Sequence, residues 1–168
     1  FTKMSACSND YIYINLFDEE NKVSSPEFLS IYLSDRHNGV GGDGVILICP
    51  SDKADAQMRM FNLDGSEGWM CGNGIRCVAK YIFDNGIAKG QKVGEGRYLL
   101  HIDTKSGVKD CTVITKNGLV SKVTVDMGRA ELAPEKIPVR LEGDRVVDKP
   151  ISIGGNVYRI TCCSMGNP

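Results

Sequence analysis

The sequence predicts an α+β fold that combines many short strands with two helices, one of them central. Runs of β-favouring residues recur along the chain, and apolar residues follow helical spacing in two segments. Glycine, asparagine and proline mark the turns between these elements. The 168 residues, 42% of them hydrophobic, suffice for the core of one domain or for parts of two small ones.

Four strands are expected in the first part of the chain, at about residues 1–7, 10–16, 45–49 and 56–62. Between the second and the third, Ser24-Ser25 precedes Pro26 and an apolar run that reaches Leu33. A serine cap followed by proline is typical of a helix start. We therefore expect a helix here, with its apolar residues on one side.

The most regular helix is expected over residues 72–85, its last turn ending near Asp84 before the stop signal Asn85-Gly86. Four apolar residues fall on one face of it at helical spacing: Ile75, Val78, Ala79 and Ile82. Beyond it the pattern becomes strand-like, at 98–102, 108–115, 119–126, 151–153 and 157–163. Asn117-Gly118 is a strong hairpin signal, and a second hairpin is expected around Gly154-Gly155-Asn156.

Composition and charge exclude several classes of protein. Lys and Arg total 20 against 21 Asp and Glu, and no basic stripe suited to nucleic acid is present. The longest strongly apolar run, residues 45–49, is far too short to span a bilayer, and the N-terminus lacks a signal-peptide core. Seven cysteines, an odd number, favour reduced thiols. We expect a cytoplasmic protein with no nucleic-acid or membrane partner.

Residues 39–44, Gly-Val-Gly-Gly-Asp-Gly, match the G-x-G-x-x-G pattern of dinucleotide-binding loops. That function requires a strand before the loop and a helix opening from it, so that the pyrophosphate lies at the helix N-terminus. Here the predicted helix comes first and the strand follows. We therefore interpret the segment as a turn whose glycines permit positive φ or close packing.

Cys71 is the strongest candidate for a chemical role. It lies six residues before Cys77, a spacing that suits neither a zinc site nor a C-x-x-C redox pair, and His37 and His101 lack matching partners. The open alternatives for Cys71 are a core cysteine and a nucleophile or base. Cys77 lies inside the predicted helix, so we expect it to be a packing residue.

The position of Cys71 favours the chemical role. A cysteine just before a helix faces backbone N–H groups without helical partners and the positive end of the helix dipole, which both stabilise a thiolate. The same N–H groups can bind a carboxylate, and the glycines of Gly72-Asn73-Gly74 allow a ligand to approach closely. One short segment could thus hold an α-carboxylate beside a sulfur. Asn9 and Asn62 could add hydrogen bonds to a polar substrate.

Residues 61–67, Phe-Asn-Leu-Asp-Gly-Ser-Glu, followed by residues 70–77, Met-Cys-Gly-Asn-Gly-Ile-Arg-Cys, resemble the first active-cysteine motif of the diaminopimelate epimerases. Three other segments fit the same family, in family order: Ser8-Asn9-Asp10, Asp35-Arg36-His37 and Ser164-Met165-Gly166-Asn167-Pro168. The cysteine motif is quite specific. Each of the other segments is weak evidence for the family alone, but together they are strong evidence. The resemblance spans the whole chain.

The resemblance implies two similar domains, each a mixed β-sheet wrapped around a central helix, with the active site in the cleft between them. It implies an isomerase of lysine biosynthesis that interconverts LL- and meso-2,6-diaminopimelate without pyridoxal phosphate, metal or other cofactor. One cysteine removes the α-proton of this small amino-acid substrate, and a second delivers a proton to the opposite face. Cys71 matches the first catalytic cysteine. The residues that match substrate contacts are Asn9, Asn62, Gly72, Asn73 and Asn167.

The domain boundary is expected near Asn117-Gly118, so that residues 1–118 form a first epimerase-like domain and residues 119–168 begin a second. The second cysteine motif and the Glu-Arg pair that binds the distal end of the substrate are absent. We therefore expect an N-terminal portion that is inactive without its missing C-terminal portion. The family resemblance also suggests a homodimer.

Two departures from the family pattern bear on function. Residues 5–8, Ser-Ala-Cys-Ser, stand where family members usually have a glycine-rich segment, and Gly44 stands where many members have a substrate-contacting Gln. Two alternatives stay open. One is a racemase or isomerase of the same fold on another substrate, such as a proline racemase-like or phenazine-pathway isomerase-like protein. The other is a non-catalytic truncated module.

Overall fold

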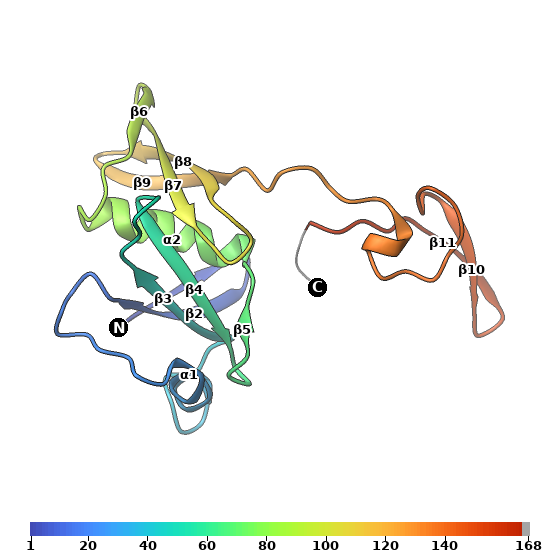
Figure 1. The fold of residues 1–168 in the computed structure, drawn as a ribbon, viewed down its shortest axis with the longest axis horizontal. Helices are drawn as coiled ribbons and strands as arrows, with labels where there is room; N and C mark the ends of the chain where they lie inside the picture. Colours follow the sequence, from blue (N-terminus) through green and yellow to red (C-terminus); the bar gives the residue numbers. More distant parts are fainter. Residues whose placement is uncertain (166–168) are drawn as a thin grey trace. The chain divides into compact units, whose positions relative to one another are not determined.

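The computed structural model describes residues 1–165, and these belong to two compact units, Phe1–Asp126 and the residues from Met127 onward (Figure 1). The first unit holds a large sheet and the α-helices α1 and α2, and the second is built around a hairpin. The predicted α+β class is confirmed. Among the described residues, no helix is both long and apolar enough to cross a membrane.

The sheet of the first unit has nine strands in the order β1-β2-β3-β4-β7-β8-β9, with β5 paired to β4 and β6 paired to β7. Their bounds are β1 Thr2–Ala6, β2 Asn9–Asn15, β3 Gly44–Cys49, β4 Ala56–Asn62, β5 Glu67–Gly68, β6 Gln91–Gly94, β7 Arg97–Asp103, β8 Lys109–Lys116 and β9 Leu119–Val125. The pairs β2–β3 and β4–β7 are parallel and the others antiparallel, so the sheet is mixed, as expected.

Helix α2 (Gly72–Asp84) is the centre of the first unit. It contacts both end strands of the sheet, β1 and β9, and also β2, β4, β7 and β8, so the sheet curves around it (Figure 1). Ile75, Val78 and Ile82 are fully buried, and each such side chain contributes about 2 kcal/mol through burial. The helix ends where Asn85 N–H donates to Tyr81 O, at the predicted stop. The central helix is therefore confirmed.

Helix α1 (Pro26–Ser34) packs on the other face of the same strands. Val45 and Leu47 of β3 belong to a buried cluster that Leu33 of α1 joins. Ile46, which points to the opposite face, lies close to Gly74 of α2. Strand β3 is thus buried on both faces, which explains its unbroken apolar sequence.

The inward side of α1 is not its apolar side. Ser30 and Ser34 are buried, whereas Phe28, Ile31 and Tyr32 are exposed. Ser30 Oγ lies 2.8 Å from the carbonyl oxygen of Asn62 and 3.1 Å from that of Phe61, so the helix approaches β4 through a small hydroxyl side chain. Phe28, Ile31 and Tyr32 lie three and four residues apart and so share a side of the helix, but that side faces outward. A helix that packs through serine against backbone carbonyls carries no apolar signal at those positions.

The second unit contains the predicted hairpin. Strands β10 (Lys149–Ile153) and β11 (Asn156–Ile160) pair around Gly154-Gly155, and both glycines have positive φ. A short 3-10 turn, η1 (Pro134–Lys136), precedes them. Glycine adopts positive φ without the steric cost that a side chain brings, so both positions of this turn favour glycine.

The turn Asn117-Gly118 joins β8 to β9, and its two residues have φ values of 54° and 80°, which confirms the predicted hairpin. The same turn was expected to mark the domain boundary. In the structure β9 completes the large sheet, and the two units divide between Asp126 and Met127. An Asn-Gly turn signals a tight reversal and carries no information on whether the paired strands share a domain. That the later residues begin a second epimerase-like domain stays a prediction.

Cys7 and Ser8 form the two-residue turn between β1 and β2, with φ values of 52° and 63°. Positive φ at both positions is the geometry for which Asn-Gly is preferred. In an L-residue other than Asn or Asp this conformation costs about 1 kcal/mol. The turn therefore carries backbone strain directly before Asn9.

We predict that Ser8→Gly raises the free energy of unfolding by about 0.5 to 1 kcal/mol, because the relief of strain exceeds the added chain entropy of glycine. Chemical denaturation measures the change. Ser24, an exposed residue with φ outside the positive region, provides the control. Ser24→Gly should lower stability by a few tenths of a kcal/mol. A loss of stability in both variants would contradict the strain at Ser8.

Candidate functional site

Cys71 is the residue before the first turn of α2, where the structure confirms the predicted helix start. Its backbone is extended, and its half-buried Sγ accepts a hydrogen bond from the N–H of Gly74 at 3.3 Å. A Cβ at Gly74 would lie 2.6 Å from Cδ1 of Ile46, so a side chain there would require the end of Ile46 to move. The sulfur therefore lies at the amide end of the helix, and it is not packed away from the backbone.

Asn9 reaches the same sulfur from the beginning of β2. Its Oδ1 lies 3.2 Å from Cys71 Sγ and accepts a hydrogen bond from the thiol. Its Nδ2 donates to Oδ2 of Asp43 at 2.5 Å. The fold thus brings together three residues that are far apart in the sequence: one from the β1–β2 hairpin, one from the glycine-rich turn and one from the start of α2.

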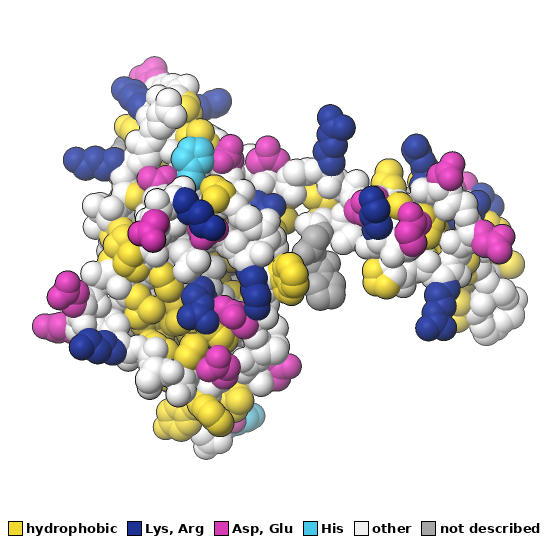
Figure 2. Space-filling view, in the orientation of Figure 1, with side chains coloured by type: hydrophobic (Ala, Val, Ile, Leu, Met, Phe, Trp, Pro, Cys, Tyr) yellow, Lys and Arg dark blue, Asp and Glu magenta, His cyan; other side chains and the backbone are white. Residues whose placement is uncertain are grey.

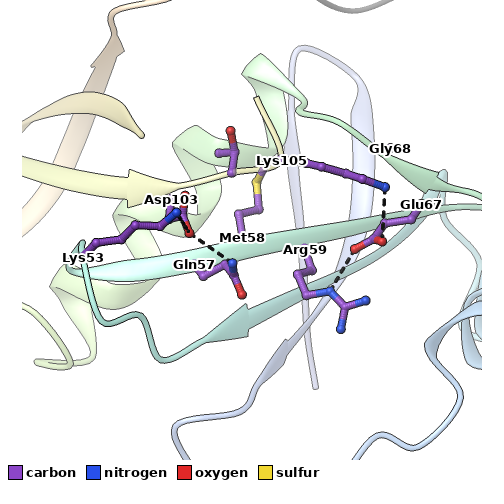
Figure 3. Close-up of a pocket in the computed structure, with 9 residues that line it drawn as sticks. Lys53, Gln57, Met58, Arg59, Glu67, Gly68, Asp103 and Lys105 are labelled. Carbon is purple, nitrogen blue, oxygen red and sulfur yellow. Dashed lines mark hydrogen bonds and ion pairs between the residues drawn. The ribbon is translucent and has the colours of Figure 1, made fainter. Parts of the chain in front are cut away.

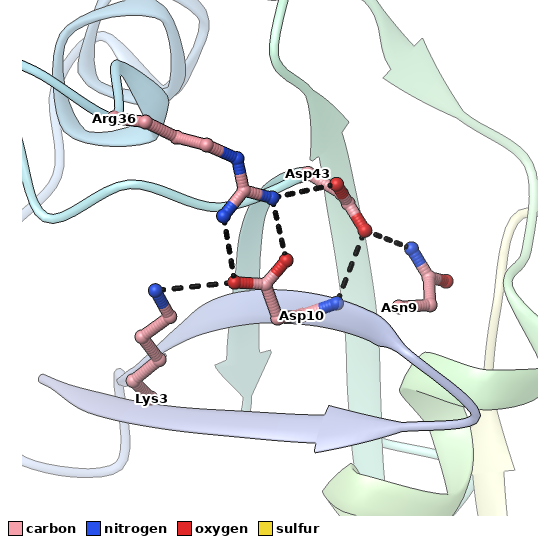
Figure 4. A network of polar contacts seen from close by, with 5 residues as sticks. All are labelled: Lys3, Asn9, Asp10, Arg36 and Asp43. Carbon is pink, nitrogen blue, oxygen red and sulfur yellow. Dashed lines mark hydrogen bonds and ion pairs between the residues drawn. The ribbon is translucent and has the colours of Figure 1, made fainter.

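Asp43 belongs to a network of charges around the hairpin (Figure 4). Arg36 donates to both carboxyl oxygens of Asp10, at 2.7 and 3.2 Å, and to Oδ1 of Asp43 at 3.1 Å. Lys3 lies 3.1 Å from Asp10. The backbone N–H of Asp10 donates to Asp43 Oδ2 at 3.0 Å, and the N–H of Asp43 donates to Asp10 O at 2.7 Å. The glycine-rich turn is therefore fixed to the start of β2 by backbone and side-chain bonds together.

Two buried tyrosines of β2 lie beneath the sulfur. Burial, followed by the influence of Cys71, raises the pKa of Tyr11 to about 12. Burial also raises the pKa of Tyr13 far above its ordinary value, and its hydroxyl donates to Gly74 O at 3.4 Å. Both hydroxyl groups are therefore neutral at physiological pH, and they lie close enough to Cys71 to influence it.

The other predicted site residues have different surroundings. Gly72 and Asn73 form the first turn of α2, and Asn73 Oδ1 accepts a hydrogen bond from Arg76 at 2.6 Å. Asn62 ends β4 opposite Gly44, and its Nδ2 donates to Ser66 Oγ at 3.0 Å. Asn167 lies outside the described residues. Of the predicted set, Asn9 and Cys71 are brought into direct contact.

Cys77 is buried inside α2, as predicted, and burial raises the pKa of its thiol. The sequence analysis assigned no role to Asp43 or Tyr11. One signal for Asp43 was available, because it is the acidic residue inside an otherwise apolar, glycine-dense turn. Tyr11 carried no such signal, since it reads as an ordinary strand residue.

A hollow of about 540 Å³ on the same sheet does not include Cys71 (Figure 3). Its charged side chains pair with one another. Lys53 lies 3.4 Å from Asp103, and Glu67 binds Arg59 at 2.8 Å and Lys105 at 3.4 Å. These ion pairs account for the charges in the hollow, so its chemistry gives no reason to place the reaction there.

The model of one protein family, diaminopimelate epimerase, matches residues 1–133. The chain is similar over its whole length to the diaminopimelate epimerases of Agathobacter rectalis, with 49% identity, and Acetivibrio thermocellus, with 45%. The matches cover 58% and 57% of those proteins. The chain therefore spans little more than half the length of these curated relatives.

Solved structures share the fold at lower identity. A hydroxyproline epimerase from Agrobacterium vitis has a TM-score of 0.62 and 14% identity, and the match covers 96% of this chain and 47% of that one. A probable proline racemase from Agrobacterium radiobacter has a TM-score of 0.59 and 15% identity, with the same coverage. These likenesses show that the fold of this chain occurs in solved structures.

Gly44 leaves no room for the glutamine that many family members were expected to have there. A Cβ at this position would collide with the carbonyl oxygen of Phe61 and lie 2.9 Å from a ring carbon of Tyr11. We predict that Gly44→Gln lowers the free energy of unfolding by at least about 2 kcal/mol. Gly86→Gln is the control, because nothing lies within 4 Å of its Cβ position; it should lose only about 1 kcal/mol through its positive φ. Equal losses, measured by denaturation, would contradict the steric argument.

The pKa of Asp10 yields a prediction on pH. The hydrogen bond from Arg36, helped by Lys3 and opposed by burial, lowers this pKa from 3.8 to about 2. Because the folded-state pKa is the lower one, the stabilisation is present above about pH 4 and is lost as the pH falls toward 2. Arg36 and Lys3 are exposed, so Asp10→Asn should cost only about 1 kcal/mol at pH 7.

The difference in stability between the wild type and Asp10→Asn should therefore shrink as the pH falls from 5 to 2, as thermal unfolding can measure. Ser24→Ala, which changes an exposed residue without a titratable group, supplies the control. Its difference from the wild type should not change over this range. A constant difference for Asp10→Asn would show that the network does not stabilise the ionised carboxylate.

Proposed function

The chain belongs to the diaminopimelate epimerase family, and from this membership we propose that the whole protein interconverts LL- and meso-2,6-diaminopimelate. The observation that carries the proposal is the position of Cys71. Its sulfur lies at the N-terminus of α2, in contact with Gly74 N–H and Asn9 Oδ1. An acid-base group beside free helix amides is what removal of a proton next to a carboxylate requires.

The first N–H groups of a helix have no partner within the helix and carry partial positive charge. In our proposal those of Gly72 and Asn73 bind the α-carboxylate of the substrate. When the α-proton leaves, the electron pair of the C–H bond is delocalised toward this carboxylate. Preoriented N–H dipoles stabilise the added negative charge without having to reorganise.

Inversion then requires two acid-base groups on opposite faces of the α-carbon. Cys71 serves one face, and we assign the other to a second cysteine from the portion of the protein beyond this chain. As thiolate, one sulfur takes the α-proton and becomes a thiol, while the other thiol gives its proton to the opposite face and becomes a thiolate. The proton count balances, and the two cysteines exchange states in each turnover. No cofactor is needed for this sequence.

Asn9, Asn62, Asn73 and Asn167 are assigned to polar contacts with the substrate. The contact between Asn9 and Cys71 supports this assignment for Asn9, because a group that touches the sulfur also lies near the reacting carbon. Asn62 Nδ2 donates to Ser66 and Asn73 Oδ1 accepts from Arg76, so in our assignment the other end of each amide contacts the substrate. The assignment of Asn167 rests on the family resemblance.

We predict that Cys71→Ser lowers the epimerase activity of the whole protein by a factor of about 10² to 10⁴, because a hydroxyl is a far weaker acid and base at neutral pH. The measurement is the interconversion of LL- and meso-diaminopimelate together with exchange of the α-hydrogen in D₂O. Cys163→Ser is the control, since Cys163 is exposed and belongs to the second unit. It should keep wild-type activity.

The residues 1–168 alone should show no epimerisation, because inversion needs the second cysteine. Robust epimerisation by this chain alone, or full activity of Cys71→Ser, would overturn the two-cysteine mechanism. Parallel assays with proline and hydroxyproline test the alternative of another substrate on the same fold. Absence of turnover and exchange with all of them, in the whole protein, would favour a non-catalytic module.

A further inference from the structure

We propose that Asp43 is a positioning residue that orients the Asn9 amide, so that the amide oxygen faces Cys71 and holds the proton on its sulfur. The proposal deepens the assigned function, because it rests on Cys71 as a proton carrier. Asp43 does not touch the sulfur itself. It acts through one hydrogen bond, from Asn9 Nδ2 to Asp43 Oδ2 at 2.5 Å.

The argument begins with the two ends of the amide. An asparagine side chain has one oxygen that accepts and one nitrogen that donates, whereas an ionised carboxylate only accepts. Asn9 must therefore turn its nitrogen toward Asp43, since the opposite orientation would bring two acceptors together. The oxygen is left facing Cys71 Sγ at 3.2 Å. An oxygen in this position accepts a hydrogen bond from a thiol and repels a thiolate.

Asp43 is itself held in place from three directions. Arg36 donates to its Oδ1, Asp10 N–H donates to its Oδ2, and its own N–H donates to Asp10 O. Figure 4 shows the bonds from Arg36 and from Asp10 N–H to this carboxylate. The carboxylate is thus fixed before it orients Asn9, and the orientation needs no substrate.

Other groups around the sulfur act differently. The N–H of Gly74 donates to Sγ and favours the thiolate. Tyr11 and Tyr13 of β2 face it as neutral hydroxyls, and Cys77, within α2, is a buried thiol. Arg76 of α2 is bonded to Asn73 and lies near Cys7. Among the hydrogen bonds that the structure gives to the sulfur, the one to the oxygen of Asn9 favours the protonated form. Asp43 orients the Asn9 amide so that this oxygen faces the sulfur.

The test measures how readily Cys71 is alkylated by iodoacetamide, under reducing conditions, with the Cys71 peptide quantified by mass spectrometry. Thiolates react and thiols do not. The readout is the ratio of the rate at pH 7 to the rate at pH 10, which cancels changes in access to the sulfur. The variants are Asp43→Ala, Asn9→Ala and the double variant, with Asp10→Asn as a control that changes a neighbouring charge and leaves the Asn9–Asp43 bond.

Asp43→Ala should raise the ratio at least about threefold, because the freed amide can turn its nitrogen toward the sulfur. Asn9→Ala should also raise it, since the opposing oxygen is gone. In the Asn9→Ala background, Asp43→Ala should add less than half of its effect on the wild type. Asp10→Asn should stay within about twofold of the wild type, which sets the size of a bare charge effect.

Two results would overturn the proposal. The first is an equal effect of Asp43→Ala with and without Asn9, which would mean that the charge acts directly on the sulfur. The second is a lower ratio in Asn9→Ala, which would mean that Asn9 stabilises the thiolate; this second test stands even if Asp43→Ala does not fold. Alkylation requires no turnover, so failure of the epimerase assay and failure of this orientation are separate outcomes.

Discussion

The burial of α2 within the curved sheet is the constraint on which the rest of the structure depends. Ile75, Val78 and Ile82 are fully buried and fix the rotation of the helix about its axis. Strands β1 and β9, from the two ends of the sheet, both contact it. Once the helix is held in this way, the place of its first turn is no longer free, and Cys71 lies where β2 and β3 meet it.

The same packing explains why small residues surround the helix start. Gly74 lies against Ile46 of β3, and a side chain there would force the end of the Ile46 side chain to move. At the other face of the sheet, Ser30 brings α1 close to the end of β4. Gly44 allows the same end of β4 to lie beside the glycine-rich turn. Close approach on both faces is therefore what sets Asp43, Asn9 and Cys71 within hydrogen-bonding reach.

Local signals in the sequence were sufficient for α2 and for the hairpins at Asn117-Gly118 and Gly154-Gly155, because helical spacing and turn chemistry act over a few residues. Strands β5 and β6 were missed, since a two-residue and a four-residue strand show no periodicity. The side of α1 that faces inward could not be read from the sequence, because Ser30 packs against backbone atoms that are remote in sequence. The end of the first unit was also not readable, because β9 is held in that unit by its packing against α2, which is remote from it in the sequence.

The residues of the candidate site also differ in how far the sequence alone could identify them. Cys71 was recognisable because a cysteine, a glycine and a helix start are neighbours in the chain. The contact with Asn9 depends on the antiparallel β1–β2 hairpin, on the parallel pairing of β2 with β3 and on the packing of α2 against β1 and β2. Asp43 is one step more remote, since it acts through Asn9. Each added step multiplies the arrangements that a sequence pattern leaves open.

A residue that both takes and gives a proton in one catalytic cycle must have neither form strongly preferred by its surroundings. Around Cys71 a helix amide favours the thiolate, while an oriented amide oxygen favours the thiol. Neither is a full charge, so each shifts the balance modestly and can be offset by the other. A lysine or an ionised carboxylate in direct contact would commit the sulfur to one state. The Asp43 charge is instead kept one residue away, where it sets the orientation of a neutral group that touches the sulfur.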